Sequence, residues 1–307
     1  MPRGPRIDVP EALYHVIARG VERRAIFRAD RDREDFVDRV ARLVGEEDIT
    51  LFAYVLLDNH FHLVVRRGRR PLGQFMRRLL TGYSAAFNRR HRRAGHLFQN
   101  RYQAVLCDAD EYLLTLVRYV HRNPVRAGRV AEPAAYRWSS AGAYRRGGAP
   151  AWLETATVLE MVGGRAGYRR FMQEGAQEGK RPELSGRMTA AMEQERSRPW
   201  LGGQVLGQER FAQRAVRQAR QREAEQLMEA GRAEELPGLA AKVAKRLRLP
   251  VERLRGAGRA AAVSAARREL IRAAVLERGI RPVAVSRYLG ISTAAVAQHL
   301  RACEGAA

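Results

Sequence analysis

The segment Asp58-Asn59-His60-Phe61-His62-Leu63-Val64-Val65 joins a polar dipeptide to a β-branched run. A second extended stretch, from Ile49 to Leu57, precedes it, so the two predict a hairpin that turns at the polar dipeptide. Because side chains alternate between the faces of a strand, His60 and His62 share one face while Phe61 points into a core on the other. Two imidazoles on one face of a rigid strand suit a metal site, and a plain polar face is the alternative.

Strands and helices alternate on both sides of this hairpin. The last predicted helix ends at Asn123, because Pro124 disfavours helical geometry in the residue before it. The order predicts an α+β fold, the ferredoxin-like split β-α-β arrangement with one added helix. The flanking elements are a strand over 14–19, a helix from an Asp30 N-cap to about Gly45, a helix from Pro71 to about Arg92, a strand over 102–107 and a helix over 108–123.

The second half of the chain differs in composition. Gly147-Gly148 marks a boundary, a short helical module follows it, and residues 179–208 are polar and rich in Gly, Arg and Pro, as in a linker. From residue 209 onward the pattern is helical. We therefore expect three segments: 1–150, a helical extension with a linker over 151–208, and an all-α domain over 209–307.

The composition favours a polyanionic partner. The chain carries 56 Lys and Arg against 33 Asp and Glu, a formal net charge of +23, which predicts attraction to nucleic acid phosphates. No apolar run is long enough to span a membrane, and the first residues lack the apolar stretch of a secretory signal. The two cysteines are far apart and outside any CxxC spacing, which fits a reducing cytoplasm. No phosphate-binding glycine loop is present, so nothing supports ATP-driven chemistry.

A second constellation lies near the end of the first segment. Tyr119 and Asn123 are one turn apart on the predicted helix and share a face. If that helix crosses the sheet over His60 and His62, the four side chains converge. The imidazoles and the Asn123 amide oxygen then suit Mg²⁺ or Mn²⁺, and the Tyr119 hydroxyl suits a nucleophile that forms a covalent phosphotyrosine. Packing of Tyr119 on the sheet is the alternative.

Other residues compete for these roles. Tyr83 lies in the apolar stripe of a predicted helix, which indicates a core position. Tyr102 has no partner ligand four residues further on. His121 is two residues from Tyr119 and therefore lies off its helical face, so we do not expect it to be a ligand.

Basic side chains surround the predicted site. Together with neighbouring aromatic residues they suit a groove that follows a single nucleic acid strand and stacks its bases, and a solvated charged surface is the alternative. The candidates for DNA contact are Arg89, Arg90, Arg101, Arg118, Arg122 and Arg126.

The His60-Phe61-His62 motif, with Tyr119 and the run Asn123-Pro124-Val125-Arg126-Ala127-Gly128, resembles the single-strand tyrosine transposases. Gly95-His96-Leu97-Phe98-Gln99-Asn100-Arg101-Tyr102 is similar to the REP-associated subgroup of bacteria, and the likeness runs from about Pro10 to Tyr144. The resemblance implies that segment 1–150 cleaves and rejoins single-stranded DNA at hairpin-bearing, REP-like palindromes through a 5′-phosphotyrosine. It implies His60 and His62 as metal ligands, Tyr119 as nucleophile and Asn123 as the third ligand. We expect a monomer or homodimer associated with the nucleoid.

Residues 239–300 resemble the helical DNA-binding domain of the replication initiator DnaA. The closing stretch predicts a helix-turn-helix with its first helix over 283–289, its turn at Gly290 and Ser292 as N-cap of the second helix. The Asp-His-Thr-Thr sequence of DnaA is replaced by Ser292-Thr293-Ala294-Ala295, so DnaA-box specificity is not expected. Thr293 and Gln298 are candidates for contacts with duplex DNA, and a plain three-helix packing module would show the same periodicity.

The leading interpretation is a transposase with an added DNA-targeting module. One alternative is a catalytically inactive, transposase-derived regulator that binds DNA, against which the intact His60, His62 and Tyr119 argue. Another is a plasmid-type nicking relaxase or replication initiator. Those proteins generally arrange their tyrosine and histidine motifs differently, and this chain lacks a helicase domain.

Overall fold

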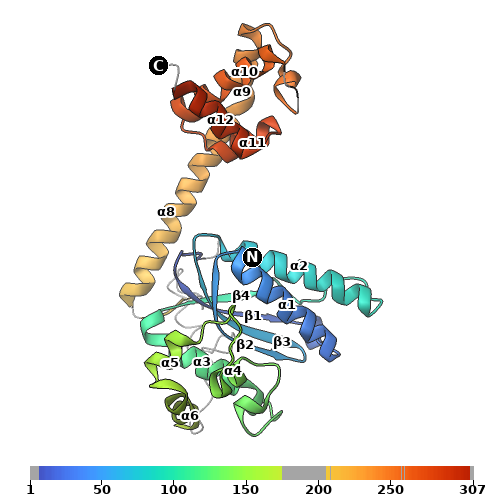
Figure 1. Ribbon diagram of the computed structural model, residues 1–307, viewed down its shortest axis with the longest axis vertical. Helices are drawn as coiled ribbons and strands as arrows, with labels where there is room; N and C mark the ends of the chain where they lie inside the picture. Colours follow the sequence, from blue (N-terminus) through green and yellow to red (C-terminus); the bar gives the residue numbers. More distant parts are fainter. Residues whose placement is uncertain (1–6, 175–204, 208, 257, 259, 305–307) are drawn as a thin grey trace. The chain divides into compact units, whose positions relative to one another are not determined.

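A computed structural model describes residues 7–174, 205–207, 209–256, 258 and 260–304 (Figure 1). Two compact units divide the chain, Met1–Ala219 and Arg220–Ala307, and each is described by itself. Across the described ranges no helix is both long and apolar enough to span a membrane.

The first unit is built on a sheet in the strand order β2-β3-β1-β4-β5. The first four strands pair antiparallel, and this order is that of the ferredoxin-like split β-α-β fold, so the predicted α+β class is confirmed. A short fifth strand pairs parallel with β4. The strands are β1 (Leu13–Arg19), β2 (Ile49–Leu57), β3 (His60–Arg67), β4 (Gln103–Cys107) and β5 (Val205–Leu206).

Helices cover both faces of this sheet (Figure 1). On one face, α1 (Asp30–Glu46) and α2 (Leu72–Arg90) bury an apolar cluster that includes Phe36, Phe75 and Phe61. On the other, α3 (Ala109–Arg126) packs its apolar stripe on side chains of the alternate strand positions. The predicted helix and strand bounds hold to within one or two residues except at the two helix ends described next.

The start of α1 differs from the prediction in its cap. Asp30 is the first helical residue, and the N-cap position belongs to Ala29. The carboxylate that satisfies the open backbone donors is that of Asp32, which accepts from the N–H groups of Arg28 at 2.9 Å and Ala29 at 3.1 Å. An acidic side chain at the third position of a helix can fold back to accept from these donors. Asp32 thus takes the capping role that we predicted for Asp30.

The end of α3 corrects the prediction that this helix stops at Asn123. The helix continues through Pro124 to Arg126. Pro124 falls in the last turn, where its missing N–H removes a single helical bond, and the Ala127 N–H donates to the Asn123 carbonyl at 3.0 Å to close the turn. Asn123 therefore has helical geometry, one full turn after Tyr119.

Three shorter helices continue the first unit beyond residue 140. They are α4 (Ala141–Arg146), α5 (Ala156–Met161) and α6 (Gly164–Glu174). Tyr144, Tyr168 and Met172 are buried in the same cluster as the apolar side of α3. The compact units divide within α8 (Glu209–Glu234), whereas the sequence pattern placed breaks near residues 150 and 208. Most of the predicted linker lies outside the described residues, and its Val205–Leu206 forms β5.

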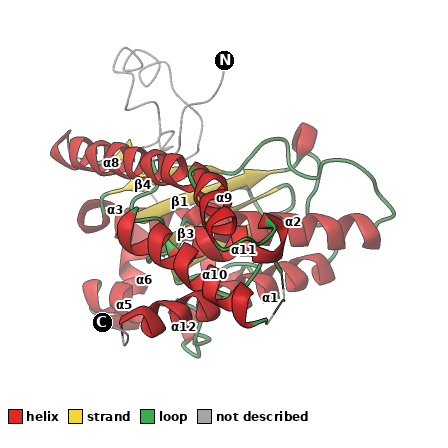
Figure 2. Cartoon of the chain, turned by 90° about the horizontal axis from the view of Figure 1, so that it is seen from above, coloured by secondary structure: helices red, strands yellow, loops and turns green. Residues whose placement is uncertain are grey.

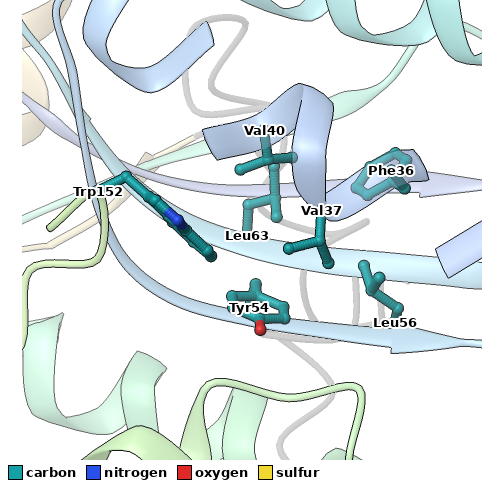
Figure 3. Close-up of a pocket in the computed structure, with 7 residues that line it drawn as sticks. All are labelled: Phe36, Val37, Val40, Tyr54, Leu56, Leu63 and Trp152. Carbon is teal, nitrogen blue, oxygen red and sulfur yellow. The ribbon is translucent and has the colours of Figure 1, made fainter. Parts of the chain in front are cut away.

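Trp152 closes one edge of the core under α1. Its ring lies 5.9 Å from that of Tyr54 on β2, centroid to centroid. Figure 3 shows the indole beside an apolar crevice between α1 and the sheet, lined also by Val37 and Leu63. The crevice has only apolar walls and belongs to the core.

The second unit is all-α across its described residues, as the sequence predicts (Figure 2). Gly290 has φ of 68°, a left-handed conformation that ends α11 and turns the chain. The Ser292 hydroxyl accepts from the Ala295 N–H at 3.1 Å, so its N-cap role is confirmed. Besides the end of α8, the helices are α9 (Leu236–Arg246), α10 (Ala261–Arg272), α11 (Pro282–Leu289) and α12 (Thr293–Glu304), with short segments at Val251–Leu254 and Ala273–Glu277.

Candidate active site

Strand register fixes which side chains share a face with the histidine pair. On β3, Val64, His62 and His60 alternate with core residues and face α3. The neighbouring β1 runs antiparallel, with His15 opposite Val64 and Arg19 opposite His60. Directly opposed residues point the same way, so His15 and Arg19 lie on the histidine face as well.

The predicted constellation does come together. The Tyr119 ring lies 5.7 Å from the His62 ring and 5.7 Å from the His15 ring, edge to face in both cases. The Asn123 Nδ2 is 3.4 Å from the His62 Nε2. Because α3 continues past Pro124, both side chains project from adjacent turns of one helix onto the histidines. Tyr119 is 8% exposed, whereas His60 and Asn123 are half-buried.

Hydrogen bonding fixes which nitrogen of His60 is protonated. The Asn59 Nδ2 donates to the Arg23 carbonyl at 3.0 Å, which sets the orientation of that amide. Its Oδ1 lies 2.7 Å from the His60 Nδ1, so Nδ1 carries the proton and donates. The His60 Nε2 is left with a lone pair, as a metal ligand requires.

The site keeps its histidines neutral. Burial, aided by the nearby Arg19 cation, lowers the pKa of His60 to about 4. Burial, with further contributions from His15, His60 and Arg19, holds the pKa of His62 well below its usual value. Burial alone lowers the pKa of His15 to about 3. At pH 7 all three imidazoles are uncharged and have lone pairs to offer.

Imidazole nitrogens together with an amide oxygen fit Mn²⁺ or Mg²⁺, and the nitrogens favour Mn²⁺ of the two. His60 and His62 would supply imidazole nitrogens, and half a turn of the Asn123 amide would replace its Nδ2 by Oδ1. Within residues 7–174 and the other described stretches, no group of three or more His, Cys, Asp or Glu side chains is placed to hold a metal. A third protein donor to such a cation would therefore have to be an amide, such as that of Asn123.

The competing residues lie elsewhere. Tyr83 is fully buried on the opposite face of the sheet, where its hydroxyl donates to the Ile26 carbonyl, so its predicted core position is confirmed. Tyr102 packs in that same opposite-face cluster. His121 is fully buried, with its two nitrogens 2.7 Å from the Ser140 and Tyr168 hydroxyls, so its side chain is engaged away from the histidine face.

Three of the predicted DNA-contacting arginines are engaged within the protein. Arg90 pairs with the buried Asp32 at 2.5 Å. Arg118 and Arg122 donate to main-chain carbonyls near the end of α6, at 3.4 and 2.8 Å. Charge counting along the sequence does not reveal such partners, because they come from segments tens of residues away.

The remaining candidates are exposed. Arg126 lies over the Tyr119 ring with its Cζ 4.9 Å from the centroid, which places a cation beside the predicted nucleophile. Arg89 and Arg101 are exposed on the first unit. In the second unit Thr293, at the start of α12, and Gln298, in its middle, are exposed.

Sequence reasoning missed His15 and Arg19. Both lie in a predicted strand, and their spacing of four placed them on one face. The missing information was the pairing of β1 with β3, which decides that this face is the histidine face. The predicted ferredoxin-like fold pairs β1 antiparallel with β3, so the position of His15 and Arg19 on the histidine face could have been predicted from the sequence.

The histidines, Tyr119 and Asn123 all lie within one family match. Residues 8–123 match the family model described as transposase IS200-like. This part of the sequence is therefore similar to IS200-like transposases. A solved structure of a REP-associated tyrosine transposase bound to a REP hairpin aligns with 49% of this chain and 89% of that chain, at 16% identity and a TM-score of 0.42. No curated protein matches the sequence.

Proposed function

We propose that this chain is a transposase that cleaves and rejoins single-stranded DNA, with Tyr119 as nucleophile. The observation that carries the proposal is the meeting of Tyr119 and Asn123 with His60 and His62 on one face of the sheet. A tyrosine placed only for packing would not need two neutral imidazoles and an amide beside it. The IS200-like family match over these residues supports the same function.

The proposed reaction is a transesterification. The Tyr119 Oη attacks the scissile phosphorus, the new Oη–P bond forms, and the P–O3′ bond breaks. The phenol loses its proton to solvent, and the departing 3′ oxygen takes one up to become a free hydroxyl. Attack by a 3′-hydroxyl on the phosphotyrosine reverses these steps and rejoins a strand, so no external energy source is needed.

Metal binding is part of this proposal. His60 Nε2, His62 Nε2 and the Asn123 amide oxygen would hold Mg²⁺ or Mn²⁺, which when bound polarises the phosphodiester and offsets the charge that develops on its oxygens. Arg126, 4.9 Å above the Tyr119 ring, would bring a permanent positive charge to the same phosphate.

The substrate we propose is single-stranded DNA that carries a hairpin. The net charge of +23 favours a polyanion, and the exposed Arg89, Arg101 and Arg126 offer phosphate contacts. Hairpins enter through the resemblance of the sequence motifs to REP-associated transposases.

The test uses labelled single-stranded oligonucleotides that cover imperfect palindromes beside the gene. We expect a protein–DNA adduct that survives SDS, needs Mg²⁺ or Mn²⁺, and disappears in Tyr119→Phe. Tyr102→Phe is the matched control and should retain the adduct, because that tyrosine lies on the other face of the sheet. An adduct retained in Tyr119→Phe would refute the assignment of the nucleophile. Tight hairpin binding without an adduct, with either metal, would favour the inactive regulator.

For the second unit we propose sequence-specific binding to duplex DNA through α12. Its support is the two-helix arrangement of α11 and α12 about Gly290, with Thr293 and Gln298 exposed. Mobility-shift titrations would compare duplexes from the flanks of the gene with unrelated duplexes of equal length. Equal affinities at every salt concentration would leave only non-specific charge binding.

A further inference from the structure

His15 is the closest hydrogen-bonding neighbour of His62. Its Nε2 lies 2.9 Å from the His62 Nδ1, and the two rings stack at 5.1 Å with an interplanar angle of 15°. His15 is fully buried and His62 is 2% exposed, so water does not compete for this contact. We propose that His15 is a positioning residue that holds His62 in the tautomer able to bind a metal. The inference rests on the metal site proposed above.

One proton lies between the two rings, and its position decides what His62 can do. If the proton is on the His62 Nδ1, it is donated to the His15 Nε2, and the His62 Nε2 keeps a lone pair. If it is on the His15 Nε2, it is donated to the His62 Nδ1. A neutral His62 must then carry its own proton on Nε2, where it blocks a metal. His15 therefore has to act as an acceptor.

The surroundings favour the first arrangement. The Asn123 Nδ2 lies 3.4 Å from the His62 Nε2, and an N–H donor in that place matches a lone pair on Nε2. His60 shows the same pattern, since its Nδ1 donates to the Asn59 Oδ1 and its Nε2 is left open. Both histidines thus give Nδ1–H to a neighbour from the protein, and only the neighbours differ.

His15 itself is held by this one bond. Its Nδ1 has no hydrogen-bond partner within the described part of the chain, although it is buried. A buried polar atom without a partner is costly, and an apolar residue would fill this position in β1 more favourably. Retention of an imidazole here is explained if its Nε2 is needed by His62.

The experiment measures Mn²⁺ binding to the full chain by calorimetry, without DNA. His15→Phe keeps an aromatic ring of similar size but removes the acceptor, and we expect Mn²⁺ affinity to fall about 10- to 100-fold, the usual effect of losing an outer-shell partner. His15→Gln places an amide oxygen near the former Nε2, and we expect it to restore most of that loss. Equal Mn²⁺ affinity in wild type and His15→Phe would overturn the proposal.

Val105→Ala is the control for packing. Val105 lies opposite His15 on β4 and is 5% exposed, so its truncation disturbs the same part of the core without touching a hydrogen bond. We expect it to leave Mn²⁺ affinity unchanged. If it weakens Mn²⁺ binding as much as His15→Phe does, the effect is one of packing and the proposal is overturned.

A second readout needs no metal and no variant. In ¹⁵N NMR spectra of the wild-type chain with labelled histidine, we expect His62 to carry its proton on Nδ1. A proton on Nε2 would overturn the role of His15 directly. The Tyr119 adduct assay tests the proposed reaction, and the NMR measurement tests the role of His15. A failure of one can therefore be distinguished from a failure of the other.

Discussion

Substitution of Arg90 tests which arginines stabilise the fold and which ones contact DNA. Its guanidinium pairs with Asp32 at 2.5 Å and with Asp35 at 3.2 Å, and its side chain is 25% exposed. Asp32 is completely buried. We predict that Arg90→Ala destabilises the first unit, whereas Arg89→Ala, at the exposed neighbouring position, weakens DNA binding and leaves stability unchanged.

The size of the effect follows from what Asp32 retains. Removing one partner of a buried ion pair costs about 3–5 kcal/mol when the remaining charge is uncompensated. After Arg90→Ala, Asp32 still accepts from the backbone N–H groups of Arg28 and Ala29 and lies 2.9 Å from the His91 Nε2. We therefore expect a loss of about 2 kcal/mol in the free energy of unfolding, below the uncompensated value.

The pH dependence has a defined sign. Burial by itself raises the pKa of Asp32, but hydrogen bonds from His91, the Arg28 backbone, Arg90 and the Ala29 backbone outweigh it and lower the pKa below its ordinary value. A lowered pKa stabilises the fold above the unfolded value of about 3.9 and loses that contribution as the pH falls through the folded value. The difference between wild type and Arg90→Ala is therefore full at pH 7 and shrinks below about pH 4.

Urea unfolding followed by tryptophan fluorescence makes this measurement, because Trp138 and Trp152 lie in the first unit and the sequence from Arg220 onward contains no tryptophan. For Arg89→Ala we expect a stability change within about 0.5 kcal/mol, with a smaller salt dependence of single-strand binding. If Arg90→Ala leaves stability at pH 7 unchanged and weakens DNA binding as Arg89→Ala does, the structural role assigned to Arg90 is wrong.

Two further predictions concern α3. Arg126→Ala removes the cation that lies above the Tyr119 ring. We expect adduct formation to slow about twofold to fivefold, because an exposed cation that offsets charge developing on the attacked phosphate contributes about 0.5–1 kcal/mol; an unchanged rate would contradict it. Tyr168→Phe leaves the buried His121 Nδ1 without its 2.7 Å partner, and we expect unfolding to become about 1–3 kcal/mol easier in the same fluorescence assay. A midpoint equal to that of wild type would show that the contact contributes nothing.

Local pattern was enough for most of the fold. Alternation placed His60 and His62 opposite Phe61, and helical spacing placed Tyr119 and Asn123 on one side of a helix. Both rest on periods that a chain cannot violate within a regular element. The predicted end of α3 at Asn123 was wrong. The helix continues through Pro124 because this proline lies in the last turn, where only one helical hydrogen bond is lost.

The local pattern of the sequence could not predict which groups the charged side chains pair with. Arg90 is 58 residues from Asp32, and Arg122 is 50 residues from the Met172 carbonyl to which it donates. The surplus of arginine in the sequence indicates that some of these side chains face a polyanion, but it does not identify them. Arg126 and Arg101 kept their predicted exposure, whereas Arg118 and Arg122 are drawn toward α6 by main-chain carbonyls.

Helix α3 is held from the side opposite Tyr119 and Asn123. His121 follows Tyr119 by two residues, about 200° around the helix, and its two nitrogens lie 2.7 Å from hydroxyls on Ser140 and Tyr168. Turning α3 by one residue, about 100°, would break both contacts and carry Tyr119 away from His62. Ser140 and Tyr168 therefore set the rotation of α3 about its axis, and α6 packs into the same apolar cluster as the histidine face of the sheet.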